Sequence, residues 1–128
     1  MAEAAKKRRI LVADDDKHCS SLLRDFLQDL GYDVEVVADG AALYRVAPEM
    51  LPDLIISDLD MPGLSGGTAQ ALLRVSPATR DIPIIFVTGQ TQDRQARLVE
   101  FRPETRIFSK PIDLKQLAEA VKAELSSR

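Results

Sequence analysis

The sequence lacks the features that mark secreted and membrane-bound proteins. Cys19 is the single cysteine, which excludes an internal disulfide and is typical of a chain in a reducing compartment. No apolar run approaches the roughly 18 residues of a membrane span, and the run ILVA is too short for the core of a signal peptide. We therefore expect a cytoplasmic protein without a membrane partner.

The sequence also lacks an excess of basic charge. It has 17 Lys and Arg residues against 20 Asp and Glu residues, a formal charge of −3, whereas attraction to nucleic acid or to an anionic membrane requires a basic face. The run KKRR, residues 6–9, is compatible with a docking patch, but we favour a solvated flank to the first strand. We expect no direct nucleic-acid binding and assign residues 1–8 to a flexible basic N-terminal segment.

The sequence has enough hydrophobic residues to form the core of one domain, since 45% of its 128 residues are hydrophobic. We assign residues 9–128 to this domain. Short apolar runs rich in β-branched residues indicate central parallel strands buried on both faces, and one alternating run indicates a half-exposed edge strand. The central strands are predicted at 9–13, 54–57, 84–88 and 106–109, and the edge strand at 33–38.

Helical patterns separate these strands. The apolar residues of the clearest helix repeat at helical spacing up to Leu30 and stop at Gly31, and the last helix follows Asp113, which is placed to cap it. Weaker patterns predict helices at 40–47, 67–75 and 91–101, each followed by a proline. The alternation predicts an α/β fold: a doubly wound, five-stranded parallel sheet of order 2-1-3-4-5 with five helices, which is flavodoxin-like.

Polar side chains follow the strands at their carboxyl ends. Asp14 and Asp15 follow the first strand, Asp58 the third, Thr88 ends the fourth, and Lys110 follows the fifth. Ligands of such sheets bind outside these ends where the strand order reverses, here between strands one and three. Carboxylates that converge there repel one another unless a cation lies among them or some are protonated. Magnesium suits a few carboxylates and a phosphate better than calcium or zinc does, so we predict Mg²⁺.

Asp58 is the reactive candidate, because the third strand carries it to the edge of the sheet while Asp60 lies in the following loop. A carboxylate near magnesium can attack a phosphorus atom and hold the phosphoryl group as an acyl phosphate. Lys110 would then pair with a phosphoryl oxygen, and the Thr88 hydroxyl would donate a hydrogen bond. Each residue alone has an ordinary structural explanation, so the assignment depends on their combination.

Taken together, ILVADDD, DLIISDLDMPG, IIFVTG and FSKP resemble the receiver domain of two-component response regulators, in this order and across nearly the whole chain. The resemblance implies that Asp58 accepts a phosphoryl group from a sensor histidine kinase or a histidine phosphotransfer protein. It implies signalling to a downstream protein target or output domain, and no enzymatic activity on other substrates. It also implies that Asp15, Asp58 and the backbone carbonyl of Asp60 bind magnesium directly, with Asp14 helping through water.

In the family that the chain resembles, the residue at Thr88 moves inward on phosphorylation together with an aromatic residue three positions before the lysine. That position is Ile107 in this sequence, and strand alternation places the adjacent Phe108 on the opposite face. We therefore expect the domain to switch its interaction surface with an altered output.

Three alternatives compete with this interpretation. The pair DLD at 58–60 also resembles aspartate-dependent phosphatases of the haloacid dehalogenase type, but it follows the third strand and lacks a downstream acidic pair. A flavin-binding electron carrier would need a Ser-, Thr- and Gly-rich loop after the first strand, where this chain has three aspartates. An unphosphorylated receiver-like interaction module remains the main alternative, because of Ile107.

Overall fold

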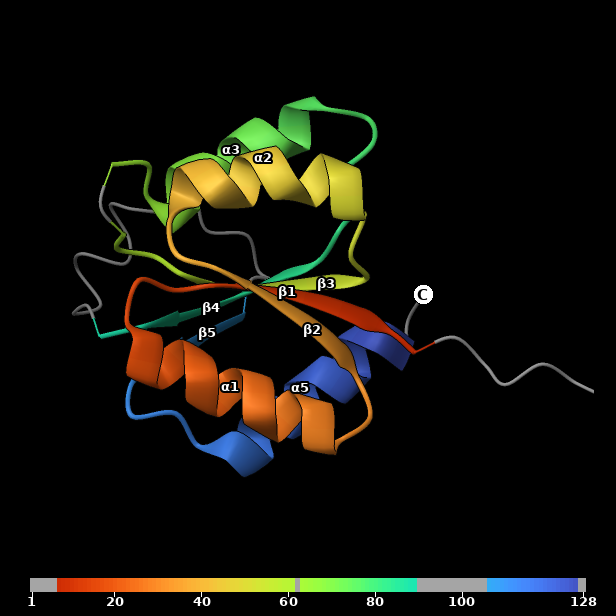
Figure 1. The fold of residues 1–128 in the computed structure, drawn as a ribbon. Helices are drawn as coiled ribbons and strands as arrows, with labels where there is room; N and C mark the ends of the chain where they lie inside the picture. Colours follow the sequence, from red (N-terminus) through yellow and green to blue (C-terminus); the bar gives the residue numbers. More distant parts are fainter. Residues whose placement is uncertain (1–6, 62, 90–105, 127–128) are drawn as a thin grey trace, which may run out of the picture.

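The computed structural model describes residues 7–61, 63–89 and 106–126, and Figure 1 shows their path. Strands and helices alternate along the described chain. The elements are β1 (Arg9–Ala13), α1 (Lys17–Asp29), β2 (Asp33–Val37), α2 (Gly40–Met50), β3 (Leu54–Asp58), α3 (Gly66–Val75), β4 (Ile84–Thr88), β5 (Arg106–Ser109) and α5 (Leu114–Ser126).

The five strands form one parallel sheet of order β2-β1-β3-β4-β5, which confirms the predicted strand order. In β2, Val34 is buried and Glu35 is exposed, as expected of an edge strand with one buried face. The predicted order already places the fifth strand at an edge, but the prediction that this strand is buried on both faces is wrong. Among the described strands β5 pairs with β4 alone, and it is partly exposed along its length.

Helices cover both faces of the sheet. Helices α1 and α5 lie on one face, and α2 and α3 lie on the other (Figure 1). Each face has its own apolar core, since alternate residues of a strand point to opposite faces. Leu11 and Phe86 belong to the core under α2 and α3, whereas Ile10 and Val87 belong to the core under α1 and α5.

The helix boundaries follow from capping side chains. Asp16, Asp39 and Ser65 accept hydrogen bonds from the first turns of α1, α2 and α3, and Asp113 accepts one from the Gln116 backbone N–H in α5. Gly31 has a φ of 98°, which agrees with its predicted place after the first helix. The structure describes four helices, and the expected helix at 91–101 lies outside the described residues.

The predicted end of α2 before Pro48 is wrong, because the helix continues to Met50. A proline lacks the N–H of the regular helix ladder. The last turn is nevertheless held by the burial of Met50 in the core and by a hydrogen bond of 2.8 Å from the Leu51 N–H to the Ala47 carbonyl.

Part of the predicted flexible segment 1–8 is fixed to the domain. Residues 1–6 lie outside the described part of the chain, but the Arg8 guanidinium donates a hydrogen bond of 3.2 Å to the Leu125 carbonyl. The Arg8 carbonyl also accepts a hydrogen bond of 2.9 Å from the Asp33 N–H. Among the helices that the structure describes, we find none with the length and apolar character to cross a membrane.

Candidate functional site

The acidic residues come from two strands that lie side by side. β1 ends at Ala13, which pairs with Ser57 of β3, so Asp14 and Asp58 lie next to each other at the carboxyl ends of these strands. Asp14 and Asp58 are buried and Asp15 is exposed. One carboxylate oxygen from each of the three residues lies within 4.8 Å of the other two. The structure therefore brings together the three aspartates that the sequence predicts to converge.

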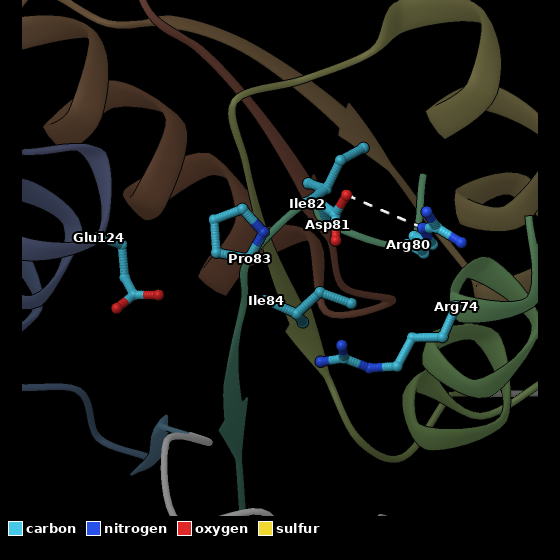
Figure 2. A pocket seen from close by; sticks show the side chains of 7 residues that line it. All are labelled: Arg74, Arg80, Asp81, Ile82, Pro83, Ile84 and Glu124. Carbon is cyan, nitrogen blue, oxygen red and sulfur yellow. Dashed lines mark ion pairs between the residues drawn. The ribbon is translucent and has the colours of Figure 1, made fainter. Parts of the chain in front are cut away.

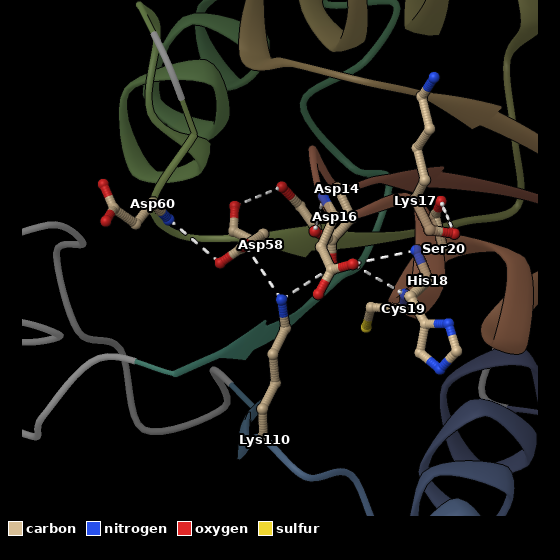
Figure 3. Close-up of polar contacts among 10 residues, drawn as sticks. Asp14, Asp16, Lys17, His18, Cys19, Ser20, Asp58, Asp60 and Lys110 are labelled. Atoms are coloured by element: carbon tan, nitrogen blue, oxygen red, sulfur yellow. Dashed lines mark hydrogen bonds and ion pairs between the residues drawn. The ribbon is translucent and has the colours of Figure 1, made fainter.

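Lys110 supplies the positive charge nearest to these carboxylates (Figure 3). Its Nζ lies 3.1 Å from Asp14 Oδ2 and 3.2 Å from Asp58 Oδ2. The backbone places this side chain, because the Lys110 N–H donates a hydrogen bond of 2.9 Å to the Thr88 carbonyl at the end of β4. The peptide bond between Lys110 and Pro111 is cis.

Backbone N–H groups orient the two buried carboxylates. The Asp60 N–H donates a hydrogen bond of 3.2 Å to Asp58 Oδ1, and the Asp16 N–H donates one of 2.9 Å to Asp14 Oδ1 (Figure 3). Asp14 Oδ2 is buried and accepts no hydrogen bond of good geometry within the described structure, although it is ion-paired with Lys110. A buried anionic oxygen without a hydrogen bond, beside two further carboxylates, fits a site for a hard divalent cation.

The surroundings of these groups shift their pKa values. Burial raises the pKa of Asp58 above its ordinary value of 3.8, although the Asp60 N–H and the Lys110 ammonium both oppose the shift. Burial alone would lower the pKa of Lys110, but its contact with Asp14 and the charge of Asp58 outweigh that effect and raise its pKa. Lys110 therefore stays positively charged. The ionised form of Asp58 is less stable in the folded protein than it would be in water.

We expect Asp58→Asn to raise the midpoint of thermal unfolding at neutral pH in buffer that contains a chelator. Because the folded chain binds the Asp58 proton more tightly than the unfolded chain does, the ionised carboxylate costs stability above its folded pKa. That cost disappears as the pH falls toward the unfolded value of 3.8. The difference between variant and wild type should therefore shrink on acidification, and a difference that grew would contradict the assignment.

The two residues predicted to switch lie on neighbouring strands, Thr88 on β4 and Ile107 on β5. Thr88 is fully buried at the end of β4. Ile107 of β5 packs against the core under α2 and α3, whereas Phe108 packs against the core under α1 and α5. The prediction that the two β5 side chains face opposite sides of the sheet is confirmed, so Phe108 does not replace the missing aromatic side chain.

Sequence reasoning missed two residues that shape the site. Asp16 belongs to the aspartate run, but its carboxylate caps α1 by accepting hydrogen bonds from the N–H groups of His18 and Cys19. Gly66 begins α3 against the end of β3, where an added Cβ would collide with the Asp58 carbonyl oxygen. The run of aspartates before a helical pattern signals the cap, but no local pattern in the sequence signals the close approach at Gly66.

Cys19 lies near the cluster but does not belong to the group of candidate metal ligands. Burial, reinforced by the charge of Asp14, raises the pKa of the Cys19 thiol to about 12. The side chains whose ligand atoms lie close enough to share one cation, among the described residues, are those of Asp14, Asp15 and Asp58. Such a set of carboxylate oxygens is typical of a site for a hard cation.

A hollow of about 200 Å³ lies at the start of β4, beside Ile84, at the end of the strand away from the aspartate cluster (Figure 2). Arg74 and Arg80 contribute positive charge to its lining, and Asp81 and Glu124 contribute negative charge. Arg80 is ion-paired with Asp81 at 3.9 Å. Because its charges balance, this hollow does not favour a phosphate, and it is separate from the aspartate cluster.

Comparison with known proteins agrees with this geometry. The model of the response regulator receiver domain family matches residues 10–122. The chain belongs to this family. The DNA-binding dual master transcriptional regulator RpaA of Synechocystis sp. PCC 6803 is 35% identical over 117 residues, which are 90% of this chain and 48% of the regulator. The receiver domain thus spans about half the length of this curated relative.

Solved receiver domains have the same fold. The signal receiver domain of a histidine kinase from Syntrophus aciditrophicus is 32% identical, with a TM-score of 0.85 over 94% of this chain and 91% of that one. The receiver domain of the sensor histidine kinase PA1611 from Pseudomonas aeruginosa PAO1 is 25% identical, with a TM-score of 0.82 over 94% of this chain and 99% of that one. The latter was solved with a magnesium ion coordinated in its active site cleft.

Proposed function

We propose that Asp58 of this receiver domain is the phosphoacceptor, and that it takes its phosphoryl group from a phosphohistidine on a sensor histidine kinase or a phosphotransfer protein. The observation that carries the proposal is the position of the Asp58 carboxylate: it lies at the end of β3, 3.2 Å from Lys110 Nζ and within 4.8 Å of the carboxylates of Asp14 and Asp15. A nucleophile, an anion-binding cation and a metal-binding group of acids thus meet at one point.

The metal site is proposed on the same residues. Asp15, Asp58 and the backbone carbonyl of Asp60 would hold Mg²⁺ directly, and Asp14 would hold it through water. When bound, magnesium neutralises charge on the carboxylates and on the phosphoryl oxygens. The magnesium ion in the cleft of the PA1611 receiver domain supports this choice of metal.

In the proposed transfer, an oxygen of the Asp58 carboxylate attacks the phosphorus atom and forms a new P–O bond. The P–N bond to the donor histidine breaks, and its electron pair stays on the imidazole nitrogen. The Lys110 ammonium, which stays protonated, pairs with a phosphoryl oxygen, and the Thr88 hydroxyl donates a hydrogen bond to another. Water later hydrolyses the acyl phosphate, so the domain contributes to its own phosphorylation and dephosphorylation and is not an enzyme for other substrates.

The phosphodonor is proposed to dock beside the cluster. A hollow of about 270 Å³ adjoins Lys110 and is lined by side chains of α1 and by residues that follow β5, among them Leu22, Pro111 and Ile112. The Leu22 side chain on α1 is 49% exposed. An apolar surface next to an anion-binding lysine suits a protein that presents a phosphohistidine from an apolar helix face.

The output is proposed to be altered by Ile107. This side chain fills the position of the aromatic switch and already packs against the core under α2 and α3. With no aromatic ring to rotate there, movement of Thr88 would reach the output surface through shifts of the backbone. Rotamer exchange of an aromatic side chain at that face on phosphorylation, observed by NMR, would exclude this mechanism.

The downstream partner is proposed to be a protein target or an output domain. RpaA, which is described as DNA-binding, is about twice as long as the region that it shares with this chain. The receiver domain itself has a net charge of −3, so we propose that it contacts no nucleic acid directly. We place the protein in the cytoplasm, where a kinase would reach it.

The test is incubation of the chain with a small acyl-phosphate donor, with magnesium or with a chelator, followed by intact mass measurement. We expect one lasting phosphoryl adduct with magnesium, formed at least about tenfold more slowly with the chelator, because the clustered carboxylates then repel the donor. Continuous turnover of the donor without a lasting adduct would favour the phosphatase alternative. No adduct under either condition would favour the unphosphorylated interaction module.

A further inference from the structure

Most of the exposed apolar side chains gather on one side of the molecule. The structure describes six large hydrophobic side chains as exposed, and four of them lie on α2, on α3 or at the end of α2. These four are Tyr44, Leu51, Leu72 and Val75, with exposed fractions of 45, 53, 39 and 80%. The two helices are neighbours on the same face of the sheet (Figure 1). Scattered exposed leucines are ordinary, whereas an apolar group on neighbouring helices marks an interaction surface.

Helix α3 carries large apolar side chains on its outer side as well as on its buried side. Thr68, Ala71, Leu72 and Val75 are exposed and are spaced as one face of a helix. The only charged residue of α3 is Arg74, which is half-buried at the flank of this face. A helix with large apolar side chains on both sides is expected to be covered on both, and in the described structure only the inner side of α3 is covered.

Helix α2 adds a second apolar row and a pair of charges. Tyr44, Pro48 and Leu51 are exposed at helical spacing. Leu51 adopts a left-handed backbone conformation with a φ of 49°, where glycine or asparagine is the usual residue. The Leu51 side chain, which is 53% exposed, extends the apolar row of α2 by one turn.

The two outward charges of α2 have no ion-pair partner among the residues that the structure describes. Arg45 and Glu49 lie one turn apart on the exposed side of α2. Neither forms an ion pair within the part of the chain that the structure describes. A second α2 that runs in the antiparallel direction would place its Glu49 opposite Arg45 and its Arg45 opposite Glu49.

The two helices are aligned so that a single two-fold axis can relate both of them to the same two helices of a second copy. Gly40 at the start of α2 packs against the backbone of Leu64, two residues before α3 begins. Both helices connect parallel strands, so they run in the same direction from this contact. At a rise of about 1.5 Å per residue, Ala47, midway between the two charges of α2, is then about level with Leu72 in the middle of the outer face of α3. A two-fold axis that crosses both helices at this level places α2 against α2 of the second copy, and α3 against its α3. Arg45 of each copy then lies opposite Glu49 of the other, as a two-fold interface requires.

We propose that the outer face of α2 and α3 is an interface between two copies of this chain, related by that axis. Arg45 of one copy pairs with the partner's Glu49, and the exposed side chains of Tyr44, Leu72 and Val75 are buried. Two adjacent helices, each about 16 Å long, supply an interface of about 1,000 Å² in total, at the lower limit of biological interfaces. The dimer is therefore weak, and it forms at concentrations on the order of 100 µM.

The test is sedimentation equilibrium of the full chain over a range of concentrations. We expect the wild-type mass to rise toward that of a dimer and Val75→Glu to remain a monomer. Leu30→Glu is the matched control, because Leu30 is 50% exposed at the end of α1, on the other face of the sheet. Circular dichroism should confirm that each variant is folded, because both side chains are at the surface.

Exchanging the charges of Arg45 and Glu49 tests whether the partner is a second copy of this chain or a different protein. Arg45→Glu and Glu49→Arg should each weaken the dimer about tenfold, because each variant places like charges opposite one another twice. The double variant should recover the wild-type dissociation constant. A monomeric wild type at about 1 mM, a dimer that survives Val75→Glu, or a double variant no stronger than the single ones would overturn the proposal.

Discussion

The Asp58→Asn variant is expected to gain no phosphoryl mass under conditions in which the wild-type chain gains one phosphoryl group. The amide that replaces the carboxylate is a poor nucleophile and cannot form the acyl phosphate. The rest of the site should survive the change, because an asparagine side chain has nearly the same shape and the Asp60 N–H can still donate to its oxygen. Intact mass spectrometry after treatment with an acyl-phosphate donor and magnesium measures the result.

The matched control for this experiment is Asp60→Asn. Asp60 is an exposed acid two residues away, and its proposed contribution to the metal site is its backbone carbonyl, which the substitution retains. We therefore expect Asp60→Asn to form the adduct. If Asp58→Asn is phosphorylated as fully as wild type, peptide mapping of the modified residue would show that another side chain is the acceptor.

Gly66→Ala is expected to lower the free energy of unfolding by at least about 2 kcal/mol. The added Cβ would collide with the Asp58 carbonyl oxygen and crowd the Ser57 hydroxyl, so the start of α3 would have to move away from the end of β3. A backbone displacement in a closely packed region strains its neighbours as well. Urea denaturation monitored by circular dichroism measures the change.

Gly89→Ala is the matched control, because an added Cβ at Gly89 meets no atom of the described residues within 4 Å. Its stability is expected to stay within about 0.5 kcal/mol of wild type. Equal stability of the Gly66→Ala variant and wild type would show that α3 can shift at little cost, and that the close approach at Asp58 does not fix the position of the helix.

The strands and the cluster could be predicted from the sequence because both depend on short local signals. An apolar run that ends in an aspartate identifies a buried strand and the residue carried to its end, and the parallel order then brings Asp14 and Asp58 together. Neither step requires knowledge of how helices pack. The prediction of Lys110 likewise follows from its place directly after the last strand.

The features that the sequence did not predict depend on contacts between elements. Pro48 was expected to end α2, but the burial of Met50 beyond it outweighs the missing N–H. The close approach of Gly66 to Asp58 joins the start of one helix to the end of a strand. β5 is partly exposed although its composition is that of a strand buried on both faces. Tertiary packing decides each of these cases.

The hydrogen bond from Lys110 to Asp58 joins residues that are 52 positions apart, through the last strand and the third. Such long loops are closed late in folding, since their entropic cost is recovered only when the remaining contacts form. A nascent chain that has emerged from the ribosome only as far as α3 carries the three aspartates of the cluster but not the lysine that balances their charge. On the function that we propose, a chain without β5 therefore lacks the cation that pairs with a phosphoryl oxygen, and we expect it to accept no phosphoryl group from the kinase.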